Sequence, residues 1–474
     1  MSGFLSKERI TAGPGFNRWL IPPAALAVHL SIGQAYAFSV FNEPLTRVIG
    51  INEPAQGDWG IPALGWIFSI AIVFLGLSAA VFGEWVEEVG PRKTMFTAAC
   101  CWGAGFIVSA IGVWTHQLWL LYFGYGVLGG IGLGLGYISP VGTLIRWFPD
   151  RRGMATGMAI MGFGGGALIG SPLGVSLIGL FETDSSVGVA PTFITMGVLY
   201  FISMCLGAFV VRVPAEGWKP EGWEPPPESE QSAMITRNDV HVRDAHKTPQ
   251  FWLLWVILCF NVTAGIGVLG QASVMIQETF GGAITAAAAA GFVGLLSLFN
   301  MVGRFFWAST SDYIGRKMTY FIFFGLGTAL YALVPLFGSG LNSVFFFVLA
   351  FGIILSMYGG GFATIPAYLA DIFGTRYVGA IHGRLLTAWA AAGVLGPVLV
   401  NYIREFQLNA GVASADAYNV TMFIMAGLLV IGFIANFLVK PVDPKFHMSE
   451  SGEEEREEAS STSASSSSSK PAEA

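Results

Sequence analysis

The stretch LLSLFNMVGRFFWASTSDYIGRK, residues 295–317, decides the fold of this chain. Its first half is almost wholly apolar around a single permanent charge, Arg304, and its end is the charged turn SDYIGRK. Apolar runs of about 18 or more residues, long enough to cross a bilayer, recur along the chain. Of its 474 residues 54% are hydrophobic and 11% charged, whereas soluble proteins carry about 25% charged residues. The composition therefore predicts a helical protein that crosses a lipid bilayer many times.

Twelve such runs divide into two sets of six. The first set covers residues 18–41, 64–86, 94–114, 117–143, 153–180 and 191–211, and the second covers 250–278, 283–308, 318–338, 343–369, 378–403 and 417–439. The segment between the sets is rich in proline and charge, which is typical of a linker. The end of the chain is acidic and serine-rich, so we expect it to be disordered. The predicted domains are a six-helix bundle (1–211), a cytoplasmic linker (212–249), a second six-helix bundle (250–440) and a cytoplasmic tail (441–474).

Lysine and arginine predict the orientation in the membrane. Of the 24 in the chain, 20 lie in the termini, the linker and the loops on the same side, and only Arg47 and Arg404 lie in loops on the other side. The positive-inside rule then places both termini and the linker in the cytoplasm. We expect a monomer in the plasma membrane, the inner membrane of a bacterium.

The two sets of spans repeat each other at a nearly constant offset. EEVGPRK (87–93) matches SDYIGRK (311–317), ISPVGTLIRWF (138–148) matches TIPAYLADIF (364–373), and 151–172 matches 376–397, all at 225 or 226 positions. Because both sets start on the same side, the repeat is parallel, with its axis along the membrane normal. The predicted fold is all-α, with two six-helix bundles in a parallel pseudo-two-fold arrangement, which describes a transporter that rocks around a central site.

The loops after spans 2 and 8 carry a shared pattern of glycine, acid and basic residues. The segment 83–93, GEWVEEVGPRK, resembles the loop signature of the major facilitator superfamily, with Glu87-Glu88 in place of the usual Asp-Arg and an added proline. The resemblance implies a latch that contacts the neighbouring helix end in one state; the alternative is that these charges only set topology. The expected gating residues are Gly83, Gly90, Arg92, Lys93, Asp312, Gly315 and Arg316.

Arg304 precedes Asp312 by eight residues, or about 12 Å along a helix. A charge at that depth costs about 2.5–3.5 kcal/mol on insertion scales, so it is tolerated mainly where it faces a wet cavity. A guanidinium binds a carboxylate through two parallel hydrogen bonds. We therefore expect Arg304 to anchor an anionic substrate, with snorkelling to the interface as the alternative.

Four segments carry a closer resemblance: GQAYAFSVF (33–41), NVTAGIG (261–267), GRFFWASTSDYIGR (303–316) and GRLLTAWAAAGVLGP (383–397). They are similar to the oxalate/formate antiporter family of the major facilitator superfamily, which is related to the monocarboxylate transporters. The resemblance implies that Arg304 binds the substrate carboxylate. The resemblance also implies a lysine in span 11 at the position where this chain has Trp389. Because that second positive charge is missing here, a monoanion is favoured over oxalate. Arg384 either supplies a second charge or serves the membrane interface.

Other residues could line the same site. A glutamine amide and tyrosine hydroxyls donate to carboxylates, and aromatic rings wall small cavities. His29 lies within span 1 and could carry a proton, or could simply bond a backbone carbonyl. The candidates for substrate binding, besides Arg304, are Gln34, Tyr36, Tyr137, Tyr358 and Trp389.

The sequence favours a secondary transporter of small monocarboxylates such as formate, lactate or pyruvate, by exchange or proton symport. Alternatives are an oxalate/formate-type dicarboxylate antiporter, a membrane sensor that binds a similar anion, and, least favoured, a membrane enzyme. We expect no cofactor, no metal and no nucleic-acid partner, since the chain shows neither metal-ligand spacing nor a basic patch. Its four cysteines lie in or beside apolar runs, where they are expected to pack.

Overall fold

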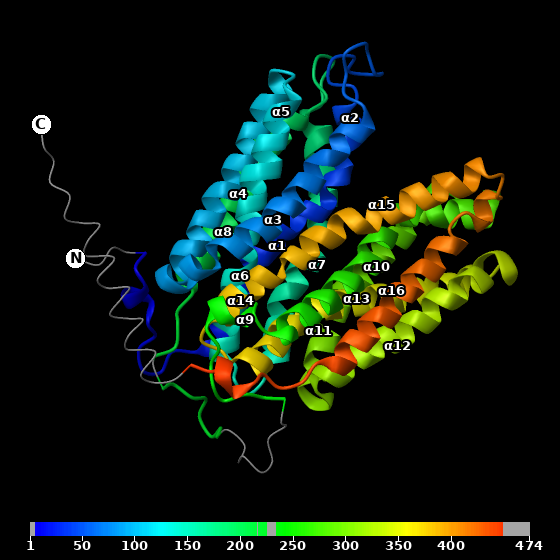
Figure 1. The fold of residues 1–474 in the computed structure, drawn as a ribbon. Coiled ribbons are helices and arrows are strands. Elements are labelled where there is room, and N and C mark those ends of the chain that lie inside the picture. Colours follow the sequence, from blue (N-terminus) through cyan, green and yellow to red (C-terminus); the bar gives the residue numbers. More distant parts are fainter. Residues whose placement is uncertain (1–4, 216, 225–233, 449–474) are drawn as a thin grey trace, which may run out of the picture.

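A computed structural model describes residues 5–215, 217–224 and 234–448, and it is nearly all helical (Figure 1). In this part of the chain, twelve helical segments are long and apolar enough to cross a membrane. The all-α fold and the number of spans predicted from the sequence are confirmed. These segments are Arg18–Leu45, Ile61–Val89, Pro91–Trp114, Leu118–Trp147, Arg152–Phe181, Val189–Val210, Pro249–Phe280, Ala288–Ile314, Arg316–Gly340, Val344–Phe373, Val378–Asn409 and Ser414–Leu438.

The first bundle consists of six spans. Span 1 changes helix type along its length, and span 4 contains a short π-helical stretch, Tyr122–Gly129, after its first α-helical turn. The elements are α1 (Ile21–Gly33), η3 (Gln34–Phe41), α2 (Asn42–Leu45), α3 (Ile61–Val89), α4 (Pro91–Trp114), α5 (Leu118–Leu121), α6 (Gly130–Trp147), α7 (Arg152–Phe181) and α8 (Val189–Val210).

The linker and the second bundle follow. Span 11 is divided at Leu386, where the helix restarts after a tight turn. The elements are α9 (Val242–Ala245) in the linker, then α10 (Pro249–Phe280), α11 (Ala286–Ile314), α12 (Arg316–Pro335), α13 (Val344–Phe373), α14 (Val378–Leu385), α15 (Thr387–Asn409) and α16 (Asn419–Leu438).

Local sequence signals explain several of the helix ends. The side chain of Thr248 caps α10 by accepting from the amide of Phe251, and Pro249 occupies the first turn, where a missing amide proton costs nothing. Gly90 and Gly315, which are repeat partners, end α3 and α11 with φ of 80° and 85°. Such a backbone conformation strongly favours glycine, so both loops turn sharply into the next span.

The linker lies at one end of the bundles, which we call the linker side. Thr11 pairs with Val213, and Val240 pairs with His447, so both ends of the described chain reach the same side. On this side α7 packs against α11 and α3 packs against α14. Figure 1 shows the helices of the two bundles diverging away from it.

Glycines allow the close contact between the bundles. A Cβ at any of three glycines would lie within about 3 Å of atoms in the other bundle. Gly76 faces Leu386 and Ala390, Gly83 faces Ala380, and Gly157 faces Ala308 and Arg304. All three glycines lie in the halves of α3 and α7 nearer the linker side. The structure is therefore a form closed at the linker side.

Candidate functional site

Arg304 lies in α11, where that helix meets α7 of the other bundle. Its side chain is completely buried. Nε donates to Oδ1 of Asn300 at 3.1 Å, and Nη1 donates to the carbonyl of Ile160 at 3.3 Å. Among the described residues no carboxylate pairs with it, and Nη2 has no hydrogen-bond partner. A buried guanidinium without a counter-ion is costly, so the fold holds an uncompensated positive charge between its two halves.

Aromatic rings from both bundles surround this charge. The guanidinium carbon lies 5.8 Å from the ring centre of Phe163 and 5.2 Å from that of Phe362. Trp389 contacts both, with ring centres 5.3 Å from Phe163 and 4.4 Å from Phe362. Because the faces of aromatic rings are negative, they offset part of the cost of the charge. Phe163 and Trp389 are 226 positions apart in the sequence, so these repeat partners meet near the pseudo-two-fold axis.

Two more donors in this cluster have no acceptor. The hydroxyl of Tyr137 and Nε1 of Trp389 are buried and unpartnered, like Nη2 of Arg304. The rings of Tyr137 and Trp389 are 5.4 Å apart. Buried polar groups are normally paired, and an unmade hydrogen bond costs about 1–3 kcal/mol. A carboxylate, which only accepts hydrogen bonds, is the ligand that fits such a set of donors.

Tyr36 and Tyr358 join the two bundles beside Arg304. Their hydroxyls are 3.2 Å apart, one from η3 and the other from α13. The ring of Tyr36 stands edge-on to Phe163 at 5.0 Å, and that of Tyr358 edge-on to Phe362 at 5.3 Å. A Cβ at Gly265 would collide with the ring of Tyr358, so this glycine makes room for the tyrosine.

Four predicted lining residues, Tyr36, Tyr137, Tyr358 and Trp389, thus belong to one aromatic cluster with Arg304. Gln34 is placed differently. Its Oε1 accepts from the hydroxyl of Tyr125 at 3.0 Å, inside the first bundle, while Nε2 has no partner. No contact links Gln34 to Arg304 in the described chain.

His29 and a second buried histidine flank Tyr137. The ring of His29 stacks on that of Tyr137 at 5.3 Å, and its Nε2 lies 3.2 Å from the carbonyl of Tyr137. His382, on α14 of the other bundle, lies 5.7 Å from the same ring. Sequence reasoning missed His382 because it falls near the end of a span; the signal that could have found it is the repeat, since its partner Thr156 is also polar.

Sequence reasoning also missed Asn300, Phe163 and Phe362. Asn300 is one helical turn before Arg304, and a polar pair at this spacing on an apolar helix is a usable signal. The two phenylalanines have no such signal, because an aromatic residue in a span can face lipid or protein equally well.

The gating residues of the second half contact the other bundle. Asp312 accepts from the amides of Gly153 at 2.9 Å and Met154 at 2.8 Å, in the first turn of α7, and Arg316 holds it at 2.6 Å. The first amides of a helix have no partners within the helix and carry partial positive charge. Asp312 is therefore an N-terminal cap supplied across the bundle interface. Gly315 provides the turn between Asp312 and Arg316.

A second carboxylate extends this contact. Asp371 of α13 binds Arg316 at 3.3 Å in its own bundle and Arg152 of α7 at 3.1 Å in the other. The four side chains Asp312, Arg316, Asp371 and Arg152 form one network, which we call the α7 latch.

The gating residues of the first half are arranged differently. Gly83 packs against Ala380, and Gly90 makes the turn. Arg92 donates to the carbonyl of Phe209, and Lys93 lies over the ring of Trp85 at 6.0 Å, both within the first bundle.

Arg384 also lies on the linker side. It binds Glu84 at 2.8 Å and the carbonyl of Val242 at 2.8 Å. Its charge is thus committed to an acid and to the linker, away from the donors around Arg304.

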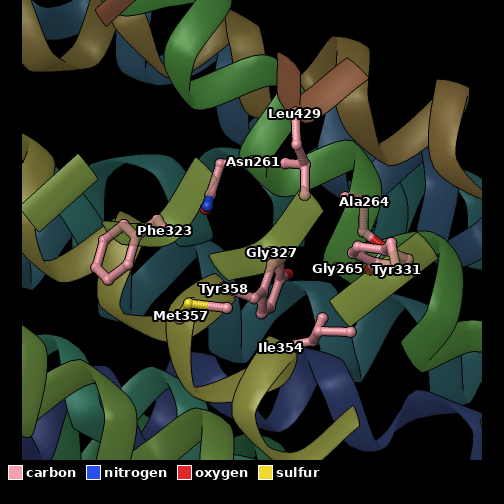
Figure 2. Close-up of a pocket in the computed structure, with 10 residues that line it drawn as sticks. All are labelled: Asn261, Ala264, Gly265, Phe323, Gly327, Tyr331, Ile354, Met357, Tyr358 and Leu429. Carbon is pink, nitrogen blue, oxygen red and sulfur yellow. Dashed lines mark hydrogen bonds between the residues drawn. The ribbon is translucent and has the colours of Figure 1, made fainter. Parts of the chain in front are cut away.

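A small cavity lies inside the second bundle, next to the aromatic cluster (Figure 2). Tyr358 and Asn261 form part of its wall, and Oδ1 of Asn261 has no hydrogen-bond partner in the described chain. Its other lining residues are Ala264, Gly265, Phe323, Gly327, Tyr331, Ile354, Met357 and Leu429. All of these lining residues belong to the second bundle, and none of them is charged. In the described part of the chain no cluster of three or more His, Cys, Asp or Glu side chains could hold a metal ion.

Comparison with known proteins is consistent with this geometry. The family model of the Major Facilitator Superfamily matches residues 15–397 and 274–471. The oxalate:formate antiporter of Oxalobacter formigenes is 29% identical over 89% of this chain and 92% of its own length. Apicoplast pyruvate carrier 1 of Toxoplasma gondii is 24% identical over 69% of this chain and 67% of its own.

The relatives extend to human proteins and to solved structures. Monocarboxylate transporter 11 of Homo sapiens is 25% identical over 83% of this chain and 79% of its own. The crystal structure of the fucose:proton symporter FucP of E. coli is similar in fold, with a TM-score of 0.60, 15% identity, and coverage of 89% of this chain and 99% of that one.

Proposed function

The chain belongs to the Major Facilitator Superfamily, and from this premise we propose that it carries small monocarboxylates, such as formate, lactate or pyruvate, across a membrane by alternating access. The observation that carries the proposal is the buried Arg304, with a free Nη2 and two further unpartnered donors around it. These groups come from both bundles. A carboxylate bound there would be held by both halves at once, which is what a carrier that rocks around its substrate requires.

The small size of the substrate follows from the crowding of the site. Rings of Tyr36, Phe163, Phe362 and Trp389 lie within contact distance of one another or of the guanidinium. One fixed positive charge matches one carboxylate. A dicarboxylate would leave its second charge among aromatic rings, and burying an unpaired charge is costly. Exchange of oxalate for formate, the activity in the name of one relative, is the alternative.

The mechanism uses residues 1–211 and 250–440 as the two moving bundles. In this proposal the α7 latch holds the linker side closed, and it must break before substrate can leave there. The hydrogen bond between Tyr36 and Tyr358 also joins the two bundles, beside the substrate site, and must break when the bundles separate there. Gln34 bonds the hydroxyl of Tyr125 within the first bundle. His29 is the residue for which the sequence predicts proton binding, with a bond to a backbone carbonyl as the alternative, and its Nε2 lies 3.2 Å from the carbonyl of Tyr137.

The orientation follows from charge. Most of the basic residues lie on the linker side, which we therefore assign to the cytoplasm. The protein is proposed to act as a monomer in a bacterial inner membrane, with both termini cytoplasmic. The acidic tail, residues 449–474, lies outside the described residues.

Counterflow in proteoliposomes tests the proposal. Vesicles preloaded with an unlabelled acid are diluted into the same labelled acid, for formate, lactate, pyruvate and oxalate in turn. A carrier accumulates label transiently against its gradient, whereas a sensor binds without accumulation. No accumulation for any small carboxylate would contradict the proposal, and accumulation with oxalate alone would favour the dicarboxylate alternative.

A further inference from the structure

His382 is buried at the interface between the bundles without any hydrogen bond. It is 1% exposed, and neither Nδ1 nor Nε2 has a partner among the described residues. Its ring lies 5.7 Å from that of Tyr137, whose hydroxyl is also unpartnered. The next residue, Gly383, packs so closely on the other bundle that its Cβ would lie 2.2 Å from the carbonyl of Ala79. The imidazole is thus held where the closed linker side meets the substrate site.

The repeat shows that packing alone does not require an imidazole here. Thr156 precedes His382 by 226 positions, and Tyr137 precedes Ala363 by the same number. In the first of these equivalent contacts, the hydroxyl of Thr156 donates to the carbonyl of Ala363 at 2.9 Å. In the second, the Tyr137–His382 contact, two unpaired polar side chains face each other. The second contact therefore costs stability, which suggests a function.

The charges around His382 decide what it can bind. Arg304 is the positive charge of the substrate site. Phe163 contacts both its guanidinium and the ring of Tyr137, and that ring in turn lies 5.7 Å from His382. Most acids of the packed helices form ion pairs at the linker side, Asp244 of α9 with Lys247 and the others with arginines, whereas Glu88 of α3 is exposed there. The pairs with arginines are Glu84 of α3 with Arg384 and with Arg243 of α9, Glu87 of α3 with Arg146 of α6, and Asp371 of α13 with Arg152 and Arg316. His382 thus belongs to the same ring cluster as the uncompensated cation, and no acid in the described chain bonds either of its nitrogens.

We propose that His382 binds the proton that is carried together with the substrate anion, an inference that rests on the proposed function. The empty site holds one positive charge, that of Arg304. An anion alone neutralises it, and an anion with a proton on His382 restores it. A bound anion stabilises a nearby imidazolium, and the imidazolium in turn stabilises the anion, so each ligand favours the other, as linkage requires.

The proton comes from water on the open side, binds a ring nitrogen of His382, and leaves to water on the other side together with the carboxylate. No bond to the substrate forms or breaks. His29 is less suited to this role, because its Nε2 is occupied by the carbonyl of Tyr137 in its own bundle. His382 has both nitrogens free and lies on the opposite bundle.

The test compares two transport assays in proteoliposomes. The first measures accumulation of a labelled monocarboxylate driven by an inward proton gradient, at about pH 6 outside and about pH 7.5 inside, values that bracket the titration of histidine. The second measures counterflow at equal pH, which needs no net proton movement. The variants are His382→Gln and His382→Asn, with His116→Gln in an outer loop as the matched control. Thermal unfolding of each purified variant verifies folding.

We expect gradient-driven accumulation to fall at least about tenfold in both His382 variants, and counterflow to fall at most about threefold. Each ratio of variant to wild type corresponds to its own free-energy difference. His116→Gln should behave as wild type in both assays. Gradient-driven accumulation retained by both His382 variants overturns the inference. So does an equal loss in both assays by folded variants, which would make His382 a substrate ligand, and so does a wild type insensitive to the proton gradient. Wild-type protein without counterflow of any carboxylate would instead contradict the proposed function.

Discussion

The two loops that close the linker side are repeat partners, yet they bind the opposite bundle differently. In the second half, Asp312 accepts from the amides of Gly153 and Met154 at the start of α7. In the first half, Glu87 lies beside Gly379, the repeat partner of Gly153, where a Cβ would be 2.6 Å from Oε1. However, Glu87 pairs with Arg146, which in turn donates to the carbonyl of Arg376.

The difference shows that two equivalent loops can close the same side of the molecule with different chemistry. A carboxylate that caps a helix gains two charge-assisted hydrogen bonds and the field of the helix end, whereas the Glu87–Arg146 contact is an ion pair between side chains of the same bundle. The repeat is also unequal at the site. Arg304 corresponds to Ala79, 225 positions earlier, so only the second bundle supplies the charge.

The largest expected effect comes from removing this asymmetry. Arg304→Ala makes the second half resemble the first, and we expect counterflow to fall by more than about 100-fold, equivalent to about 3 kcal/mol. Thermal stability of the ligand-free protein should be retained or should rise, because an uncompensated buried charge is removed. Initial counterflow rates and unfolding temperatures measure both. Arg9→Ala, at an exposed arginine, is the control, and an active Arg304→Ala protein would exclude Arg304 from the site.

Trp389 offers a second way to change the balance of charge. Trp389→Lys places a second cation among the donors around Arg304, so preference should shift from monocarboxylates towards oxalate by about tenfold, or about 1.4 kcal/mol. Thermal shift of the purified protein against formate, lactate and oxalate measures the preference. Trp389→Phe, which keeps an aromatic ring, should retain the preference for monoanions. If Trp389→Lys also retains the preference for monoanions, the number of fixed charges does not determine selectivity.

The Asp312 contact and the Glu87 contact should stabilise the closed form to different extents. Asp312→Ala removes a helix cap, which is worth about 0.5–2 kcal/mol, and should shift the protein towards a form open at the linker side. Glu87→Ala should shift it less. Spin labels at positions 88 and 313, one on each bundle, report the separation by pulsed resonance in a chain whose four cysteines are replaced. Equal shifts in the two variants would remove the distinction between cap and ion pair.

Thr156→Val should have the smallest effect. It removes the hydrogen bond to Ala363 but leaves that carbonyl within α13, so the closed form should lose no more than about 1 kcal/mol. The same pair of spin labels measures the change. A shift larger than that of Asp312→Ala would place the main closing contact in the membrane rather than at the helix end.

Much of the fold could be predicted from sequence, because a span needs only length and low polarity. The predicted second span, 64–86, became Ile61–Val89, and the seventh, 250–278, became Pro249–Phe280. The continuation of span 1 to Leu45 and the break of span 11 at Leu386 were not foreseen. Both depend on packing between helices, which leaves no periodic signal in an apolar run.

The site was harder to predict than the fold. Arg304 was visible because a charge in an oily segment needs a reason, and Asp312 because it belongs to a repeated motif. Phe163 and His382 contribute through contacts with the opposite bundle, to Arg304 and to Tyr137 respectively, and Phe362 contacts Arg304 from another helix of the same bundle. The repeat, read residue by residue, points to His382 through its polar partner Thr156, but the phenylalanines carry no such signal.

The most direct test of the central claim is calorimetric titration of the purified protein with a small monocarboxylate, comparing wild type with Arg304→Lys. Lysine keeps the positive charge but cannot form two parallel hydrogen bonds to a carboxylate. We predict saturable binding to wild type and an affinity at least about tenfold lower for the lysine variant, a difference of about 1.4 kcal/mol. Equal affinities would contradict the claim that the Arg304 guanidinium holds the substrate carboxylate.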